Sequence, residues 1–450
     1  MKKIIWLNLL VLFPVTLWGT ITFEKWYPST GRGYSVKQTF DGGYIITGER
    51  DHLMLMKTDS LGNMLWYKEY YNTNNDCGYS IQETSDLGFI ITGVTYPESL
   101  SRNALLLKTN IYGDSLWTKT YGGNLSDYGR YAIETSDGGY TVTGSYGSPS
   151  NDYDVYLIRT NSVGDTIWTR AKGGGGNDNG MALRRTADMG YIILGNTTSY
   201  GPGNPSIYLI KTDSIGITLW QKTYGGNSSN YGQSIQKFQD GGFIIAGRTT
   251  SFGAGANDVY LIRTDSTGDT IWTKTYGGLD DDFGYSIVTT HNNNCVVVGH
   301  TQSYGAGGID IYLIKTDSLG NLLWQKTYGG NNDELGRDIQ KTQDGGYIIV
   351  GYREWGVYLI KTDSLGYVGT EEKLYTTPIQ SNTNVYPNPF FHTLHIHGDS
   401  SIQIFDIAGK FITEVKEQWN GKDAQGRNIP PGIYFLKADG KPVGKVVKVR

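Results

Sequence analysis

The sequence predicts an all-β protein: a seven-bladed β-propeller closed by an N-terminal strand, followed by a small immunoglobulin-like β-sandwich. A motif of the form DGGYIITG recurs at near-constant spacing, and each copy contains four short runs with the composition of β-strands. The 62 glycines, 34 tyrosines and 11 tryptophans fit many short strands with tight turns between them and aromatic side chains between the sheets.

The repeated motif begins at positions 41, 86, 137, 188, 240, 292 and 344, so successive copies start 45 to 52 residues apart. The copy at 292 is the weakest, because Asn292 replaces the aspartate that opens the others. Self-similarity at this period is typical of stacked or circular repeats. An open solenoid is the alternative to a closed ring.

The fifth copy shows the four expected strands at residues 232–237, 242–247, 258–264 and 270–276. The third run is apolar at successive positions, which predicts a strand covered on both faces by neighbouring blades. The fourth run places Trp272, Lys274 and Tyr276 on one face, which predicts the outer strand of a blade. A lysine on that edge discourages pairing with another chain.

The two ends of the repeat array predict how the ring closes. The last copy reaches its turn at Gly366 and then lacks the tryptophan strand that the other six copies have. Upstream of the first copy, the run from Phe23 to Tyr27 aligns with the run from Trp220 to Tyr224, so Phe23 takes the place of the missing tryptophan. We therefore expect the N-terminal strand to complete the final blade.

If the strands run outward from the centre, the loops divide between two faces. The short-turn face holds the DGG turns and turns such as Asp59 to Gly62. An aspartate followed three residues later by glycine predicts a type I turn with a left-handed residue. Calcium loops are the alternative, although each turn offers one carboxylate where calcium prefers several oxygen ligands. The long-loop face holds the loops between second and third strands and those between blades.

Candidate ligand-binding residues lie on the long-loop face, where aromatic side chains recur among Asn, Asp and Gly. Such rings stack on sugars or apolar groups, while the polar side chains bond hydroxyls. The alternative is that each ring packs beneath its own loop. The predicted ligand-binding residues are Tyr146, Tyr200, Phe252, Tyr304, Asp280, Asp281, Asp282, Asp333 and Glu334.

A second candidate site lies at the seam between the first and last copies, whose loops are short. Closure of the ring would bring together Glu49, Asp51 and His52 with Arg353 and Glu354. The carboxylates would serve as acid and base, and the arginine would orient an anionic group. Ion pairs on an exposed rim are the alternative explanation.

Composition and missing motifs exclude several functions. Lysine and arginine number 39 against 43 acidic residues, a net charge of −4, so nucleic acid is not an expected partner. No nucleotide loop, HExxH or nucleophile elbow is present. His395 and His397 share a strand face, but two ring nitrogens bind a metal weakly, so neither a metal nor a cofactor is expected. Cys77 and Cys295 fall in separate copies, which argues against a disulfide framework.

The N-terminus has the pattern of an export signal. Two lysines precede an apolar stretch from Ile4 to Trp18, and Gly19 follows it. This order predicts a secretory signal peptide at residues 1–19. An uncleaved membrane anchor is the alternative, although the stretch is short for a bilayer and contains Pro14. No other segment of the sequence is long and apolar enough to be expected to span a membrane.

The remaining chain is expected to form the propeller at residues 20–368, a polar linker at 369–384 and the sandwich at 385–450. The last segment opens with YPNP, contains the turn D-x-x-G at 406–409 and the strand G-x-Y-F at 432–435, and ends on a basic strand. In these motifs it resembles the type A sorting domain of the type IX secretion system. The residues that carry the resemblance are Tyr386, Pro387, Asn388, Pro389, Gly432, Tyr434, Lys445, Lys448 and Arg450.

The resemblance implies passage across the outer membrane by the type IX machinery, followed by removal of the domain and surface attachment or release. The stretch 419–435 also resembles the immunoglobulin-like part of flagellar hook-capping proteins, so a purely structural module is the alternative. We expect an extracellular or cell-surface binding protein for a glycan or protein partner. A secreted polysaccharide hydrolase or lyase and a structural or adhesive surface component are the other hypotheses.

Overall fold

The computed structural model describes residues 21–368 except 72–75, 97–100, 151 and 291, and residues 384–448 except 387–391, 398–400, 407–410, 431 and 439–440. The predicted signal peptide and nearly all of the predicted linker lie outside the described residues, as do Pro387, Asn388, Pro389 and Arg450 of the sorting motif. The chain divides into two compact units, Met1–Thr370 and Glu371–Arg450. Among the described residues there is no helix of the length and apolarity that a membrane span needs.

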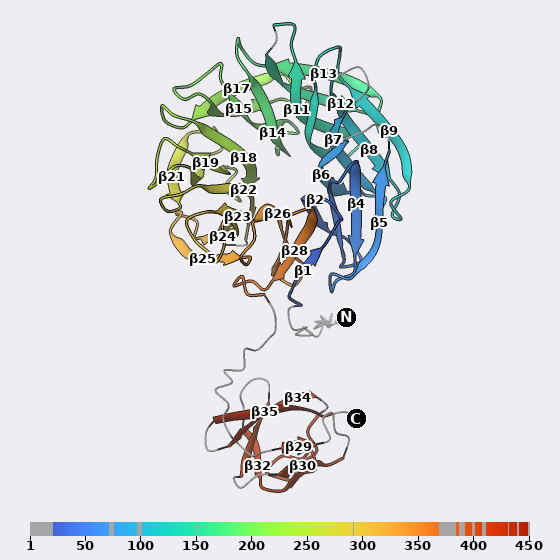
Figure 1. Cartoon of the computed structure of the whole chain (residues 1–450), viewed down its shortest axis with the longest axis vertical. Helices are drawn as coiled ribbons and strands as arrows, with labels where there is room; N and C mark the ends of the chain where they lie inside the picture. The colour runs from blue at the N-terminus through green and yellow to red at the C-terminus, as the bar shows by residue number, and fades with distance from the viewer. Residues whose placement is uncertain are drawn as a thin grey trace, which may run out of the picture. The chain divides into compact units, whose positions relative to one another are not determined.

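The first unit is a seven-bladed propeller of four-stranded antiparallel sheets arranged around a centre (Figure 1). In six blades the strands follow the chain from the inside outward. Blades one to three are β2 (Arg32–Gln38), β3 (Tyr44–Glu49), β4 (Leu53–Thr58), β5 (Met64–Tyr70); β6 (Cys77–Glu83), β7 (Phe89–Thr95), β8 (Asn103–Thr109), β9 (Ser115–Tyr121); and β10 (Tyr128–Glu134), β11 (Tyr140–Gly147), β12 (Tyr153–Thr160), β13 (Thr166–Lys172).

The second half of the ring repeats this arrangement, so the strand pattern predicted from the fifth copy holds throughout. Blades four to seven are β14 (Asp178–Arg185), β15 (Tyr191–Thr197), β16 (Ser206–Thr212), β17 (Thr218–Tyr224); β18 (Asn230–Lys237), β19 (Phe243–Thr249), β20 (Asp258–Thr264), β21 (Thr270–Tyr276); β22 (Asp282–Thr289), β23 (Cys295–Thr301), β24 (Asp310–Thr316), β25 (Leu322–Tyr328); and β26 (Glu334–Lys341), β27 (Tyr347–Arg353), β28 (Gly356–Thr362) with β1 (Phe23–Tyr27).

The predicted closure by the N-terminal strand is confirmed. β1 pairs antiparallel with β28, with Phe23 opposite Lys361 and Tyr27 opposite Val357. One hydrophobic cluster joins the first and last blades, since it contains Val36 and Ile46 of the first and residues of β27 and β28 of the last. The seventh blade therefore packs on the first as the other blades pack on their neighbours.

Blades pack face to face, as the apolar third strands predict. On β20, Tyr260 and Ile262 belong to the cluster shared with the fourth blade, whereas Val259 and Leu261 belong to the cluster shared with the sixth. All four side chains are nearly fully buried. Burial of each such side chain stabilises the fold by about 1.5–3 kcal/mol.

A repeated aromatic contact joins each blade to the next. The ring of Trp66 lies against Gly113, at the left-handed turn position of the following blade, and the hydroxyl of Tyr70 donates to the Gly113 carbonyl. Phe23 lies against Gly62 in the same way, and Tyr27 donates to its carbonyl. The contact requires glycine, because a Cβ there would collide with the ring. β1 thus reproduces the outer strand that the last blade lacks.

The DGG aspartates hold a buried cation on the third strand of their own blade. Lys361, 1% exposed, donates to Asp344 at 2.9 Å, and Lys57 donates to Asp41 at 2.9 Å. In the sixth blade, where the motif has lost its aspartate, Lys315 instead donates to the Ser364 carbonyl at 3.0 Å. In the weak sixth copy, the lysine of the third strand therefore has a different partner, and the blade is otherwise regular.

The second unit is a sandwich of two antiparallel sheets, in the orders β29-β30-β33 and β32-β31-β34-β35. Both sheets contribute to one core, in which Trp419 and Tyr434 lie edge to face at 5.3 Å. The Tyr434 hydroxyl donates to the Pro430 carbonyl at 2.7 Å. The strands are β29 (Asn384–Tyr386), β30 (Leu394–His397), β31 (Ile402–Phe405), β32 (Phe411–Val415), β33 (Gln418–Trp419), β34 (Gly432–Ala438) and β35 (Lys441–Lys448).

Candidate ligand-binding site

The inner strands of the propeller share a bulge that sends two residues of each blade to the central channel. In every inner strand the pairing with the second strand shifts at the residue after a glycine, as between Gly284 and Ser286. The glycine is needed because a Cβ on Gly284 would lie 2.9 Å from the Gly247 carbonyl of the preceding blade. The extra residue leaves the ladder and re-aims the side chains, as bulges commonly do.

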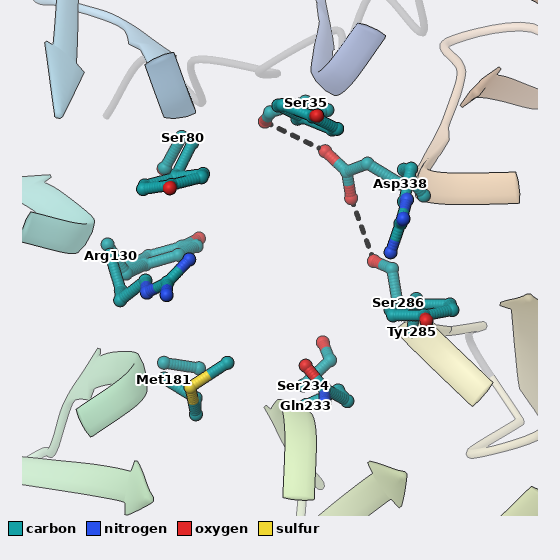
Figure 2. A pocket seen from close by; sticks show the side chains of 14 residues that line it. Ser35, Ser80, Arg130, Met181, Gln233, Ser234, Tyr285, Ser286 and Asp338 are labelled. Atoms are coloured by element: carbon teal, nitrogen blue, oxygen red, sulfur yellow. Dashed lines mark hydrogen bonds between the residues drawn. The ribbon is translucent and has the colours of Figure 1, made fainter. Parts of the chain in front are cut away.

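The channel holds a cavity of about 330 Å³, lined by these bulge positions (Figure 2). Arg130 and Asp338 lie on opposite sides of it, and Asp338 accepts hydrogen bonds from Ser35 at 2.9 Å and Ser286 at 2.7 Å. The lining residues are Tyr34, Ser35, Tyr79, Ser80, Arg130, Tyr131, Met181, Ala182, Gln233, Ser234, Tyr285, Ser286, Arg337 and Asp338.

A second cavity of about 550 Å³ adjoins the first at the long-loop face and shares Arg130, Met181 and Gln233 with it. Its walls come from the beginnings of inner strands and the ends of second strands, which both lie on that face. Amide and hydroxyl side chains dominate it, and two guanidinium groups reach it. The lining residues are Arg130, Ser145, Asn177, Asn179, Met181, Asn196, Thr198, Asn204, Pro205, Tyr231, Gln233 and Arg248.

Guanidinium groups at this channel mouth are stacked on aromatic rings. Arg130 lies 4.2 Å from the ring of Tyr79, and Arg248 lies 4.4 Å from the ring of Tyr231. Arg337 lies 4.4 Å from Tyr285. Stacking fixes the plane of each guanidinium group and therefore the directions in which its N–H groups donate hydrogen bonds.

The channel mouth is locally cationic although the chain has a net charge of −4. Among the described residues, Arg130, Arg248 and Arg337 have no carboxylate within ion-pair distance. Burial, together with the guanidinium groups of Arg337 and Arg248, lowers the pKa of His300 to about 3, so this ring is neutral. The Asp338 carboxylate is compensated within the protein, because Lys37 lies 3.6 Å away.

The aromatic residues predicted on the long loops lie against tyrosines of the third strands. The ring of Phe252 lies 5.7 Å from Tyr260, and that of Tyr304 lies 5.6 Å from Tyr312. Phe252 is nevertheless 47% exposed and Tyr304 38% exposed. Tyr146 and Tyr200 make the same kind of ring contact and are half-buried. These rings support their loops and still present a free face, and their role in binding stays a prediction.

The predicted acidic residues divide between loop support and exposure. Asp282 and Glu334 are fully buried and accept from the Gly278 and Gly330 amides at 2.7 and 3.1 Å. Asp281 accepts a hydrogen bond from the backbone N–H of Asn257, and Asp333 accepts one from the backbone N–H of Ile309. Asp280 is exposed.

Two buried carboxylates meet beside Gly277. One oxygen of Asp258 and one of Asp282 both lie against the position that a Cβ on Gly277 would take. Asp258 is 1% exposed, and burial followed by the charge of Asp282 raises its pKa. Between the fourth and fifth blades, the corresponding strands begin with Ser206 and Asn230, so the fold accommodates an uncharged pair at these positions.

We expect Asp258→Asn to raise the midpoint of thermal unfolding at pH 8 by about 2 °C. A carboxyl with a raised folded-state pKa stabilises the protein below its unfolded pKa, and this contribution is lost as pH rises through the folded pKa. The permanently neutral amide avoids that loss, so the gain should vanish towards pH 4. Asp280→Asn, at an exposed site, is the control and should change little. A gain independent of pH would contradict this assignment.

Of the predicted seam residues, Glu49 is linked to the last blade through Arg32, a residue without a distinctive sequence signal. Arg32 lies 3.6 Å from Glu49 and 4.4 Å from the ring of Trp355. Glu49 also accepts from the Tyr34 hydroxyl at 2.6 Å. Of the other predicted residues, Arg353 lies 3.5 Å from Glu334, the His52 ring lies 4.5 Å from Tyr71, and Asp51 and Glu354 are exposed.

The channel residues were missed at the sequence level. The available signal was the glycine that recurs in each copy about eight residues before the DGG-type motif, as in Gly33-Tyr34-Ser35 and Gly284-Tyr285-Ser286. Within one copy this triplet looks like the beginning of a strand. Its position at a central channel is evident only when the seven copies are arranged around a common axis.

The first unit has the β-propeller fold, which a solved structure shares. The WD40 domain of Neurospora crassa Pan2 is similar with a TM-score of 0.50 at 11% identity, over 74% of this chain and 89% of that chain. PorZ, described as an essential bacterial surface component of the type-IX secretion system of Porphyromonas gingivalis, gives a TM-score of 0.37 at 11% identity, over 95% of this chain and 70% of that chain.

Residues 384–449 match the family described as the secretion system C-terminal sorting domain. The C-terminal unit is therefore a type IX sorting domain, and the chain is a secreted β-propeller protein that this domain directs to the cell surface or extracellular space. Regulatory protein FlaEY of Caulobacter vibrioides is 27% identical over 205 residues, 39% of this chain and 21% of that protein. The chain thus spans about a fifth of that relative.

Proposed function

We propose that the protein is a cell-surface or released binding protein whose long-loop face holds a glycan. The observation that supports this most is the 550 Å³ cavity on that face, with amide and hydroxyl side chains in its wall. Such groups match the donors and acceptors of sugar hydroxyls. A rigid ring also holds loops from several blades in place, which lowers the ordering cost of binding.

The half-exposed loop aromatics extend this surface outward. A hollow of about 530 Å³ lies beside Phe252. Tyr200 lines another of about 410 Å³, whose other walls are mainly the outer strand β17 and the turn at Gly268. Exposed rings beside hollows are suited to stacking on the faces of sugar rings. A protein partner on the same face and a structural or adhesive role are the alternatives that the experiment must separate.

The test is retention and cleavage of a polysaccharide panel by the purified chain. We expect retention without cleavage, and at least about tenfold weaker retention after simultaneous Tyr200→Ala, Phe252→Ala and Tyr304→Ala. Phe40→Ala, an exposed aromatic on the short-turn face, is the matched control and should bind normally. Cleavage that Glu49→Gln abolishes would instead support the hydrolase or lyase hypothesis. Absence of retention for every polysaccharide would contradict glycan binding.

A further inference from the structure

The two cavities at the channel mouth contain more positive charge than the fold needs. The repeated ion pairs of the blades join the DGG aspartates to third-strand cations, and the Asp338 carboxylate of the smaller cavity is paired with Lys37 at 3.6 Å. Arg130 and Arg248 line the larger cavity and have no carboxylate partner among the residues that the structure describes. A cationic concave site surrounded by protein focuses its field on an anionic ligand.

The structure assigns this site to the acid group of an anionic glycan. This inference rests on the proposed glycan-binding function and names the class of sugar. Arg130 and Arg248 would hold a carboxylate or sulfate group through their N–H forks, while neighbouring amides bond the ring hydroxyls. Arginine in a fixed plane is suited to paired hydrogen bonds with such planar or tetrahedral anions.

Three features of the site favour this assignment over a water-filled channel. The guanidinium groups are pre-oriented, because Arg130 stacks on Tyr79 and Arg248 on both Tyr231 and Phe283. Neither Arg130 nor Arg248 has a carboxylate partner within the described part of the chain, so their charge is not neutralised by an ion pair. Arg130 lines both cavities, so a ligand that enters the larger one reaches the channel and Arg337 as well.

The lining also favours a sugar over an acidic peptide. A peptide of defined sequence needs apolar pockets for its side chains. The larger cavity offers only Met181 and Pro205 as aliphatic side chains, against four asparagines, one glutamine, one serine and one threonine. A ligand rich in hydroxyl groups uses such a wall more fully than a peptide does.

The experiment measures binding of the full chain to oligogalacturonate and to its carboxyl-reduced neutral counterpart by titration calorimetry. Dextran sulfate and dextran form the second pair and separate sulfate from carboxylate recognition. We expect at least one anionic probe to bind about tenfold more tightly than its neutral counterpart. Arg130→Gln and Arg248→Gln should each weaken that binding about tenfold, because each removes charge-assisted hydrogen bonds.

Arg170→Gln is the matched control, because Arg170 stacks 5.1 Å from the Trp168 ring on the outer strand β13, away from the channel. It should bind as the unchanged protein does, and thermal unfolding checks that all variants fold. Equal binding of the anionic and neutral probes, or normal binding by Arg130→Gln and Arg248→Gln, would overturn the inference. If neutral glycans still bind and this binding requires the loop aromatics, the proposed glycan-binding function holds without this inference. If none of the four probes binds, this inference is overturned.

Discussion

Deleting residues 384–450 should abolish appearance of the propeller outside the cell while leaving its fold intact. The deleted segment is the sorting domain that the secretion machinery handles. Its hydrophobic core consists of its own residues, from Leu394 to Val446, so its removal leaves every propeller cluster complete. We therefore expect the truncated chain to accumulate in the periplasm as folded protein, which cell fractionation and protease resistance would measure.

A point variant keeps the polypeptide length constant and tests the same domain. Trp419→Ala removes a buried ring that packs edge to face on Tyr434, and should cost the sandwich about 3–5 kcal/mol. Export should fall with the fold of this domain, and the propeller itself should unfold at its usual temperature. Normal extracellular amounts of the truncated chain would contradict the role of the domain in export.

The features that could be predicted from the sequence are those that short stretches determine. The alternation of residues within strands, the turn glycines and the recurring tryptophan each depend on a few neighbouring residues. Phe23 could be placed because its run has the spacing of the tryptophan strands. The sandwich could be recognised because its motifs occur in order along 66 residues.

The channel could not be predicted because its residues come from seven strands that meet only in the ring. Arg130 and Arg248 are far apart in the sequence, and one lies on an inner strand while the other ends a second strand. Neither position carries arginine in most other copies, so repetition gives no hint of them. At the seam, Arg32 lies at the beginning of a strand and had no signal of its own.

Phe23→Ala should lower the free energy of unfolding of the propeller by about 3 kcal/mol. Its ring packs on Gly62 of the first blade and lies 6.0 Å from the ring of Tyr44. The substitution empties the aromatic position at the contact between the last and first blades. Chemical denaturation followed by tryptophan fluorescence would measure the loss.

The size of this loss discriminates between a closed ring and an open array. Trp66→Ala removes the equivalent contact between the first and second blades, so in a closed ring the two variants should lose similar stability. Phe40→Ala, at a ring that is 77% exposed, should lose less than about 0.5 kcal/mol. If Phe23→Ala behaved like Phe40→Ala, the N-terminal strand would not hold the first and last blades together. The convergence of Arg130, Arg248 and Arg337 on one channel would then lose its basis, because it requires the ring to close.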